Sequence, residues 1–241
     1  MLDGCLAVEL RQYTLHDGTR ERLIDLFENE FIASQEALGI GLFGPFRDLD
    51  DPNRFVWFRG FPDMHQRSGM LSAFYDGPVW RAHRDAANAT MIDSDNVLLL
   101  RPCGVSADST PAGGFDPGTS GPDALVVATI HYIDWSALET FAQFFDKTMK
   151  PALANAGSRI LAAFETEPGT NTFPRLPVRD GETVFVWVAA FQDAGHFEDH
   201  VAALHESADW REHAPEDVLR QFSRKPEVLK LAPTPRSQLR T

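Results

Sequence analysis

The chain has 241 residues, of which 43% are hydrophobic, so it is long enough to bury two cores of ordinary domain size. Its formal net charge of -13 argues against nucleic acid as a partner, because phosphate backbones are held by clustered Lys and Arg side chains that this sequence lacks. No apolar run approaches the roughly 20 residues that span a bilayer, and Asp3 and Glu9 stand where a targeting segment would be basic. We therefore expect a cytoplasmic protein without a membrane partner.

Cys5 and Cys103 are the only cysteines, too few for a disulfide-stapled secreted domain or for a zinc site built on thiolates. We expect both to be reduced. A bond between them is the less favoured alternative, because they flank two strands that should be neighbours in the fold proposed below.

In chain order, the first half predicts alternating strands and helices. The residues from Ala7 to Tyr13 alternate between two faces, which predicts a strand, and Leu23, Phe27 and Phe31 recur with helical spacing. The predicted elements are a strand at 7–13, a helix that ends at Gly39, strands at 42–46 and 55–58, a helix that Asp63 begins and 76–78 ends, a short turn at Trp80, and a strand at 96–101.

The second half, from Leu125 to Leu231, repeats the pattern of the first half, from Val8 to Arg101. Between the halves, residues 104–123 are rich in Gly, Pro, Ser and Asp, which is typical of a flexible linker. The sequence predicts two domains, at 1–103 and 124–235. The matched residues are Tyr13 with Tyr132, Phe27 with Phe145, Gly39 with Gly157, Trp57 with Trp187, Phe61 with Phe191, Asp63 with Asp193, Trp80 with Trp210, and His83 with His213.

Each half therefore predicts a βαββαβ arrangement, that is, a ferredoxin-like domain with two helices on one face of an antiparallel sheet. The opposite face of each sheet needs a cover, and the two sheets can supply it by packing face to face as a barrel within one α+β chain. In the alternative, each half pairs with a half from another copy.

Four short motifs occur in the first half: Glu9-Leu10-Arg11-x-Tyr13, Gln35-x-x-Leu38-Gly39, Asn53-Arg54-Phe55-Val56 and Tyr75-x-x-Pro78-x-Trp80. They resemble motifs of the NIPSNAP family, which belongs to the dimeric α+β barrel superfamily. The second half resembles a diverged copy in which Ala128-Thr129-Ile130 replace the Glu-Leu-Arg triplet. The resemblance implies the barrel but little chemistry, since barrel relatives include cofactor-independent monooxygenases, haem-degrading enzymes and isomerases.

Glu9, Arg11 and Tyr13 are the candidate catalytic residues, because their spacing places all three on one face of the first strand. Arg11 could hold an anionic or carbonyl oxygen, Glu9 could orient Arg11, and Tyr13 could donate a proton or a hydrogen bond. The favoured alternative is a structural ion pair between Glu9 and Arg11 that fixes the strand against a neighbouring helix.

Histidines give weaker signals. His196 and His200 lie one helical turn apart, but such spacing is common on solvated surfaces, so we predict no metal site. His131 is a candidate haem ligand or base, although a hydrogen-bonded core histidine is the favoured interpretation, and we predict no cofactor.

The residues from 165 to 182 form a longer loop than the matching turn of the first half. Such a loop could cover a pocket, clasp a neighbouring subunit, or be a tolerated insertion.

Taken together, these features predict a protein that binds or transforms a small hydrophobic or carbonyl molecule in the cleft of the first half. One alternative is a non-catalytic interaction or scaffold protein, because no nucleophile elbow or phosphate loop occurs. Another is a haem-binding or cofactor-independent monooxygenase-type enzyme. We also expect a homo-oligomer, and leave open whether the protein is an enzyme.

Overall fold

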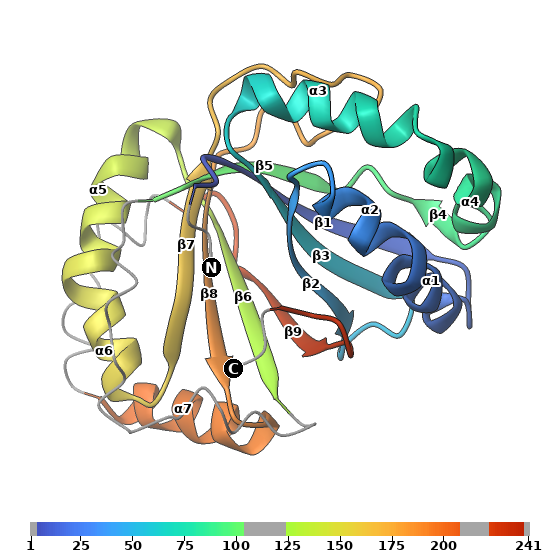
Figure 1. Ribbon diagram of the computed structural model, residues 1–241. Coiled ribbons are helices and arrows are strands. Elements are labelled where there is room, and N and C mark those ends of the chain that lie inside the picture. Colours follow the sequence, from blue (N-terminus) through green and yellow to red (C-terminus); the bar gives the residue numbers. More distant parts are fainter. Residues whose placement is uncertain (1–3, 104–123, 208–221, 239–241) are drawn as a thin grey trace. The chain divides into compact units, whose positions relative to one another are not determined.

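The computed structural model describes residues 4–103, 124–207 and 222–238 (Figure 1). The predicted linker at 104–123, together with Trp210 and His213, lies outside these residues. The chain forms two compact units, which we call the first and the second unit. The first unit comprises Met1–Arg101, Glu167–Gly181 and Pro233–Leu239, and the second comprises Pro102–Thr166, Glu182–Ala232 and Arg240–Thr241. The first unit thus includes segments from both halves of the sequence.

An antiparallel sheet forms the centre of the first unit, with strand order β2–β3–β1–β5, and β4 pairs with the end of β1. In register, Glu9 lies opposite Arg59 and Arg11 lies opposite Trp57. These two pairs bring the predicted site residues of β1 beside β3. The strands are β1 Ala7–Leu15, β2 Gly41–Asp48, β3 Arg54–Phe61, β4 Met91–Asp93 and β5 Val97–Pro102.

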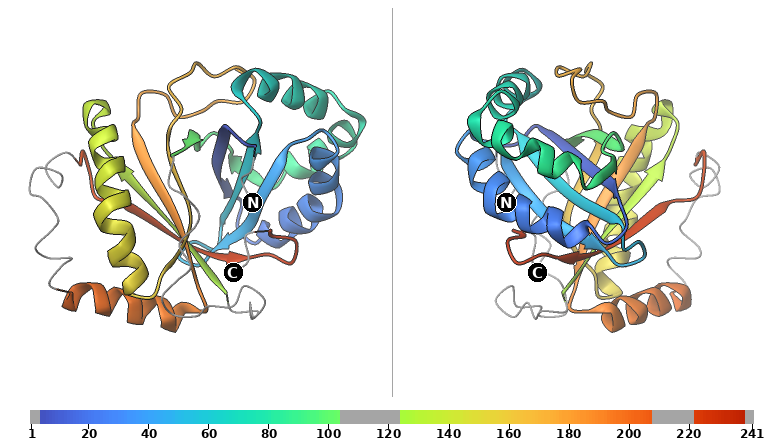
Figure 2. Two further views of the ribbon diagram at one scale, coloured as in Figure 1. Left: turned by 60° about the vertical axis from the view of Figure 1, so that its left-hand side comes forward. Right: turned by 90° about the vertical axis from the view of Figure 1, so that its right-hand side faces the viewer.

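The helices of the first unit lie on one face of its sheet, as Figures 1 and 2 show from three directions. The predicted stripe of Leu23, Phe27 and Phe31 is buried in one core with Phe55 and Trp57, which confirms its orientation. Gly39 follows the first helical segment with a φ of 83°, a left-handed conformation that glycine adopts without strain. The helices are α1 Arg20–Leu26, the π-helix η1 Phe27–Phe31, α2 Ile32–Glu36, α3 Met64–Tyr75 and α4 Pro78–Asn88.

One predicted helix start is confirmed and one predicted turn is wrong. Asp63 begins α3, and its carboxylate accepts a hydrogen bond from the Gln66 amide. After residues 76–78, however, the chain forms the 11-residue helix α4 instead of a short turn at Trp80. The reason is that Pro78 takes the first position of a new helix, where its missing N–H costs nothing.

The second unit repeats the strand order of the first, as β9–β6–β8–β7, again with antiparallel pairing. Asp193 begins α7 as Asp63 begins α3, because its carboxylate accepts a hydrogen bond from the His196 amide. The elements are β6 Leu125–Tyr132, the 3-10 helix η3 Trp135–Ala137, α5 Leu138–Phe144, the π-helix η4 Phe145–Met149, α6 Lys150–Asn155, β7 Arg159–Thr166, β8 Val184–Phe191, α7 Ala194–Glu206 and β9 Glu227–Pro233.

Sheet register corrects the predicted match between the two first strands. Trp57 lies opposite Arg11 in the first unit, whereas Trp187 lies opposite Thr129 in the second. The structural counterpart of Tyr13 is therefore His131, and the prediction of Tyr132 is wrong by one residue. Matching by aromatic identity caused the error, and a one-residue slip moves every side chain to the other face.

The fold is thus mixed α+β with antiparallel pairing, as expected. The face-to-face packing of two ferredoxin-like sheets stays a prediction. Among the described residues, no helix combines the length and apolar character needed to cross a bilayer. Cys5 and Cys103 are not bonded to each other.

Candidate functional site

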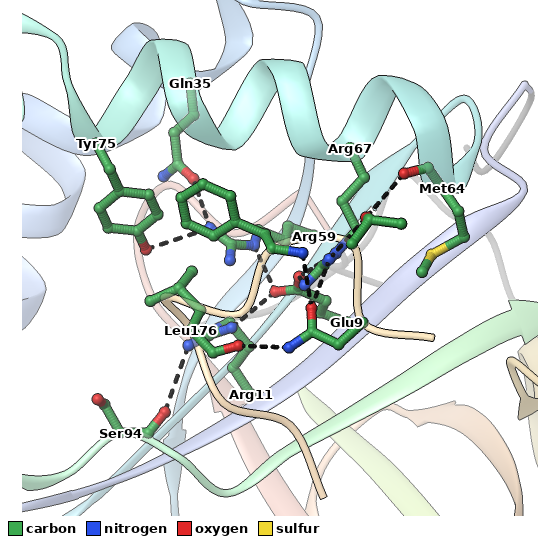
Figure 3. A network of polar contacts seen from close by, with 12 residues as sticks. Glu9, Arg11, Gln35, Arg59, Met64, Arg67, Tyr75, Ser94 and Leu176 are labelled. Carbon is green, nitrogen blue, oxygen red and sulfur yellow. Dashed lines mark hydrogen bonds and ion pairs between the residues drawn. The ribbon is translucent and has the colours of Figure 1, made fainter. Parts of the chain in front are cut away.

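Three arginine side chains converge on the carboxylate of Glu9 in the first unit (Figure 3). Arg11 Nη1 donates to Glu9 Oε2 at 2.7 Å, and Arg59 Nε donates to the same oxygen at 2.6 Å. Arg67 Nε donates to Glu9 Oε1 at 2.7 Å. We call Glu9, Arg11, Arg59 and Arg67 the arginine network. Sequence analysis identified Glu9 and Arg11 but missed Arg59 and Arg67.

Secondary structure explains why these four side chains meet. Glu9 and Arg11 share one face of β1, and the antiparallel register brings Arg59 of β3 directly opposite Glu9. Arg67 enters from the first turn of α3, whose start Asp63 determines. The network therefore lies inside the first unit, on the face of the sheet that the helices cover.

A second set of polar groups surrounds the network. Arg11 Nε donates to the hydroxyl of Tyr13 at 3.0 Å, and Arg11 Nη2 donates to the carbonyl of Ser94 at 3.3 Å. Arg59 Nη1 lies 3.5 Å from both Gln35 Oε1 and the hydroxyl of Tyr75. All three sequence-predicted residues, Glu9, Arg11 and Tyr13, are thus joined in one set of contacts.

Residues 167–181, which follow β7 in the chain, lie against the network as part of the first unit. Arg67 Nη1 donates to Asn171 Oδ1 at 3.0 Å and to Thr172 Oγ1 at 3.2 Å. The ring of Phe173 stacks on Tyr75, with centroids 5.9 Å apart and an interplanar angle of 23°. The long loop noted in the sequence therefore covers the polar site of its own chain.

The network carries more positive than negative charge. Three guanidinium groups face one carboxylate, which leaves a net charge of +2, and none of the four side chains is more than 1% exposed. Buried ions are normally balanced by partners, because their desolvation is costly. This surplus is the main sign that the site can accept an anion.

Protonation states follow from burial and from the neighbouring charges. Burial alone would raise the pKa of Glu9, but Arg59, Arg11 and Arg67 outweigh it and hold the pKa well below its usual range. Burial raises the pKa of Tyr13, so its phenol stays protonated and can donate a hydrogen bond. Burial also lowers the pKa of Arg67, and its partner Glu9 opposes that effect.

Three buried donors of the site lack a hydrogen-bond partner among the described residues, Trp57 Nε1, Arg59 Nη2 and Arg67 Nη2, although Arg67 Nη2 forms an ion pair with Glu9 Oε1 at 2.6 Å. Trp57 and Arg59 belong to the same face of β3. The guanidinium of Arg59 lies 5.2 Å from the Trp57 ring centroid, so a cation–π contact compensates part of its desolvation. A bound oxygen atom could satisfy the remaining donor capacity.

The second unit has lost every charged member of this network. Register and the matching helix starts identify the counterparts, and apolar residues replace all the ionic groups except Arg11, which becomes Thr129. Among the described residues, the arginine network is therefore confined to the first unit. The replacements are Glu9 by Val127, Arg11 by Thr129, Gln35 by Leu153, Arg59 by Ala189 and Arg67 by Phe197.

His131 belongs to the core of the second unit. Its Nε2 atom accepts a hydrogen bond from Trp187 Nε1 at 3.2 Å, and its ring stacks on Phe222 at 5.1 Å. Burial lowers the pKa of His131 to about 4. The geometry supports the core interpretation of this residue over haem ligation, because one ring nitrogen is already engaged and the ring is buried.

We expect His131→Phe to flatten the pH dependence of stability between pH 6.5 and 4. In the parent, the unfolded chain binds a proton that the folded protein excludes, so the free energy of unfolding falls by about 1.4 kcal/mol per pH unit as the pH drops. Urea unfolding at several pH values measures this slope. Equal slopes in both proteins would contradict the assignment.

The two histidines considered as metal ligands, His196 and His200, make local contacts. His196 Nδ1 accepts a hydrogen bond from the Gln192 amide at 3.3 Å, and His200 Nδ1 lies 2.9 Å from the Ala156 carbonyl. Within the described ranges, no group of three or more His, Cys, Asp or Glu side chains is placed to hold a metal ion.

Comparison with known proteins agrees with this fold. A candidate monooxygenase from Lactobacillus acidophilus is 13% identical with a TM-score of 0.59, over 94% of this chain and 93% of that one. An anthrone oxidase-like protein is 13% identical with a TM-score of 0.64, over 95% of this chain and 91% of that one. These likenesses extend over nearly the whole chain and show that the chain shares the mixed α+β fold of these structures.

The NIPSNAP family model matches residues 8–107. The match covers less than half of the chain, and it confirms that the first half resembles the NIPSNAP domain, as noted in the sequence. A NIPSNAP-like domain protein from Burkholderia xenovorans is 25% identical, with a TM-score of 0.39, over 43% of this chain and 90% of that one. No curated protein matches the sequence.

Proposed function

We propose that the first unit binds a small aromatic molecule that carries an oxyanion or a polarised carbonyl oxygen. The observation that supports this proposal is the buried surplus of positive charge in the arginine network. Guanidinium groups suit this task, since their planar donors match the oxygens of carboxylates, phenolates and enolates and they stack on aromatic rings.

Each residue of the site has a role in this proposal. Arg59 presents the donor without a partner and would bind the ligand oxygen, and Arg11 would add a second positive charge nearby. Glu9 positions the three guanidinium groups, and Tyr13 donates a hydrogen bond. The aromatic ring of Trp57 offers a surface for the apolar body of the ligand.

A second candidate function is oxidation of the bound molecule by dioxygen. Two structural neighbours that match over nearly the whole chain, a candidate monooxygenase and an anthrone oxidase-like protein, favour it. Arginines stabilise an enolate, the electron-rich form that reacts with dioxygen. A CH₂ group conjugated with the carbonyl through an aromatic ring, as in anthrone, would become a carbonyl, with one atom of dioxygen inserted and the other released as water together with the two hydrogens of the CH₂ group. Oxygen uptake with anthrone as the probe separates this candidate from simple binding.

The same proposal includes the arrangement expected from the sequence. The two halves are copies of one ferredoxin-like unit, with a linker at 104–123, and their free sheet faces pack against each other as a barrel. The repeated strand order within each unit supports a common origin. A cytoplasmic homo-oligomer, and a scaffold role as the alternative to ligand binding, stay predictions.

We expect the parent protein to bind salicylate, an aromatic anion, and to bind the neutral benzyl alcohol much more weakly. Arg59→Gln should weaken salicylate binding at least about tenfold, because one charge-assisted hydrogen bond is lost. Isothermal titration calorimetry measures both affinities. Arg47→Gln is the matched control, since Arg47 pairs with Glu21 away from the network. Unchanged binding by Arg59→Gln would contradict the proposed site.

A further inference from the structure

Arg67 donates its Nη1 hydrogens to two uncharged oxygens from residues 167–181. Asn171 Oδ1 lies at 3.0 Å and Thr172 Oγ1 at 3.2 Å. Both are neutral, so they satisfy the geometry of the guanidinium without reducing the surplus charge of the network. They occupy positions that the oxygens of an anion would take with greater energy, because an anionic oxygen adds the attraction between opposite charges to the hydrogen bond that the Arg67 guanidinium donates.

The same segment also presents an aromatic ring beside its oxygen. Phe173, two residues after Asn171, is 5% exposed and stacks on Tyr75, which itself lies 3.5 Å from Arg59 Nη1. An oxygen acceptor on an arginine and an aromatic ring on a tyrosine are the two chemical features of the proposed ligand. The segment thus resembles a ligand that is built into the chain.

We propose that residues 167–181 act as an internal competitor, which occupies the arginine network until an aromatic anion displaces it. This inference rests on the proposed function and adds its regulation. In the ligand-bound state, one oxygen of the anion binds Arg59 and another takes the place of Asn171 and Thr172 on Arg67, while its ring takes the place of Phe173 and contacts Tyr75 and Trp57.

The contacts of the segment allow its middle to leave while its ends stay attached. The amide of Glu167 donates to the Leu99 carbonyl and the amide of Arg179 donates to the Val97 carbonyl, each at 2.9 Å. Between these ends, Arg175 pairs with Asp76 at 2.9 Å, but both side chains are more than half exposed and the pair is weak.

The middle is also held by a hydrogen bond from Thr172 Oγ1 to the Met64 carbonyl at 2.9 Å, and by the ring of Phe173. A ligand that supplies an anionic oxygen to Arg67 and an aromatic ring in place of Phe173 offsets the loss of these contacts.

Hydrogen exchange with saturating salicylate tests whether the ligand releases the middle of residues 167–181. We expect faster exchange at the amides of Phe173 and Leu176, whose acceptors lie within the segment, and unchanged exchange at Glu167 and Arg179. If the segment were instead a wall that closes over the ligand, salicylate would slow exchange at Phe173 and Leu176. Slower exchange would overturn the inference.

Variants give an independent test with the same probe. Phe173→Ala and Asn171→Ala each weaken the competitor, so we expect salicylate affinity to rise by about fivefold in each. If Phe173 and Asn171 instead lined the binding site, their removal would lower the salicylate affinity. Thr170→Ala is the matched control, because Thr170 is exposed on the same segment.

The outcomes distinguish the two proposals. If salicylate binds the parent but binds Phe173→Ala and Asn171→Ala equally or more weakly, only the competitor is excluded. If salicylate binds neither the parent nor any of these variants, the proposed anion site is excluded, and the proposed competitor is excluded with it.

Discussion

Glu9→Gln is expected to destabilise the first unit by about 3–5 kcal/mol, the cost typical of removing one partner from a buried ionic cluster. The substitution keeps the shape of the side chain but removes the carboxylate that faces three buried guanidinium groups. The net buried charge then rises from +2 to +3. Urea unfolding followed by circular dichroism measures the loss.

The same variant tests whether the site attracts anions. Because the pKa of Glu9 is depressed in the folded protein, its contribution to stability is present above the ordinary pKa of the carboxyl and is lost as the pH falls through the folded value. Glu9→Gln should remove this acid-side loss, and added sulfate should restore part of its stability. Glu21→Gln is the control, since the exposed pair of Glu21 with Arg47 contributes about 1 kcal/mol or less. A destabilisation of Glu9→Gln no larger than that of the control would exclude a charge-balancing role for Glu9.

Replacing the network by its counterparts from the second unit should abolish salicylate binding while the protein stays folded. Buried ionic clusters can often be replaced by apolar residues at little cost in stability, whereas breaking them one partner at a time is costly. We therefore expect the combined variant to regain at least about 2 kcal/mol relative to Glu9→Val alone, a strong departure from additivity. The combined variant carries Glu9→Val, Arg11→Thr, Gln35→Leu, Arg59→Ala and Arg67→Phe.

Calorimetry with salicylate and urea unfolding of the same samples measure the two effects separately. The single variant Glu9→Val is the reference for stability, and the parent is the reference for binding. Retained salicylate binding in the combined variant would show that the anion is held elsewhere. A combined variant as unstable as Glu9→Val would show that the apolar set of the second unit cannot substitute for the network.

Strand alternation was sufficient to predict half of the arginine network. Glu9 and Arg11 were identified because residues two apart on a strand share a face, and the contacts of Tyr13 follow from the same rule. Arg59 could have been added from the antiparallel pairing of β1 with β3, but only with the register known. Arg67 gave no signal, because a single arginine in a helix is ordinarily solvated.

Two residues of the resemblance motifs carried information that sequence reasoning did not use. Gln35 and Tyr75 were noted only as parts of family-like motifs, yet both lie 3.5 Å from Arg59 Nη1. Their position depends on how two helices pack over the sheet, which periodicity does not specify. The helix α4 was missed for a related reason, since the sequence signals that ended α3 also begin α4.

The π-helices η1 and η4 occupy equivalent places in the two units, beginning at Phe27 and Phe145. Such wide turns are frequent at functional sites, but here one of them persists in the second unit, where the charged residues of the arginine network are replaced by uncharged ones. Both opening rings contact the matched tryptophans, Phe27 with Trp57 at 4.7 Å and Phe145 with Trp187 at 6.2 Å. On the proposed common origin, the π-helix was present in the ancestral domain before duplication. The second unit kept it after the charged residues of the network were lost. The π-helix therefore marks ancestry in this lineage, and related chains that keep the wide turn should be searched for charged residues before any activity is assigned to them.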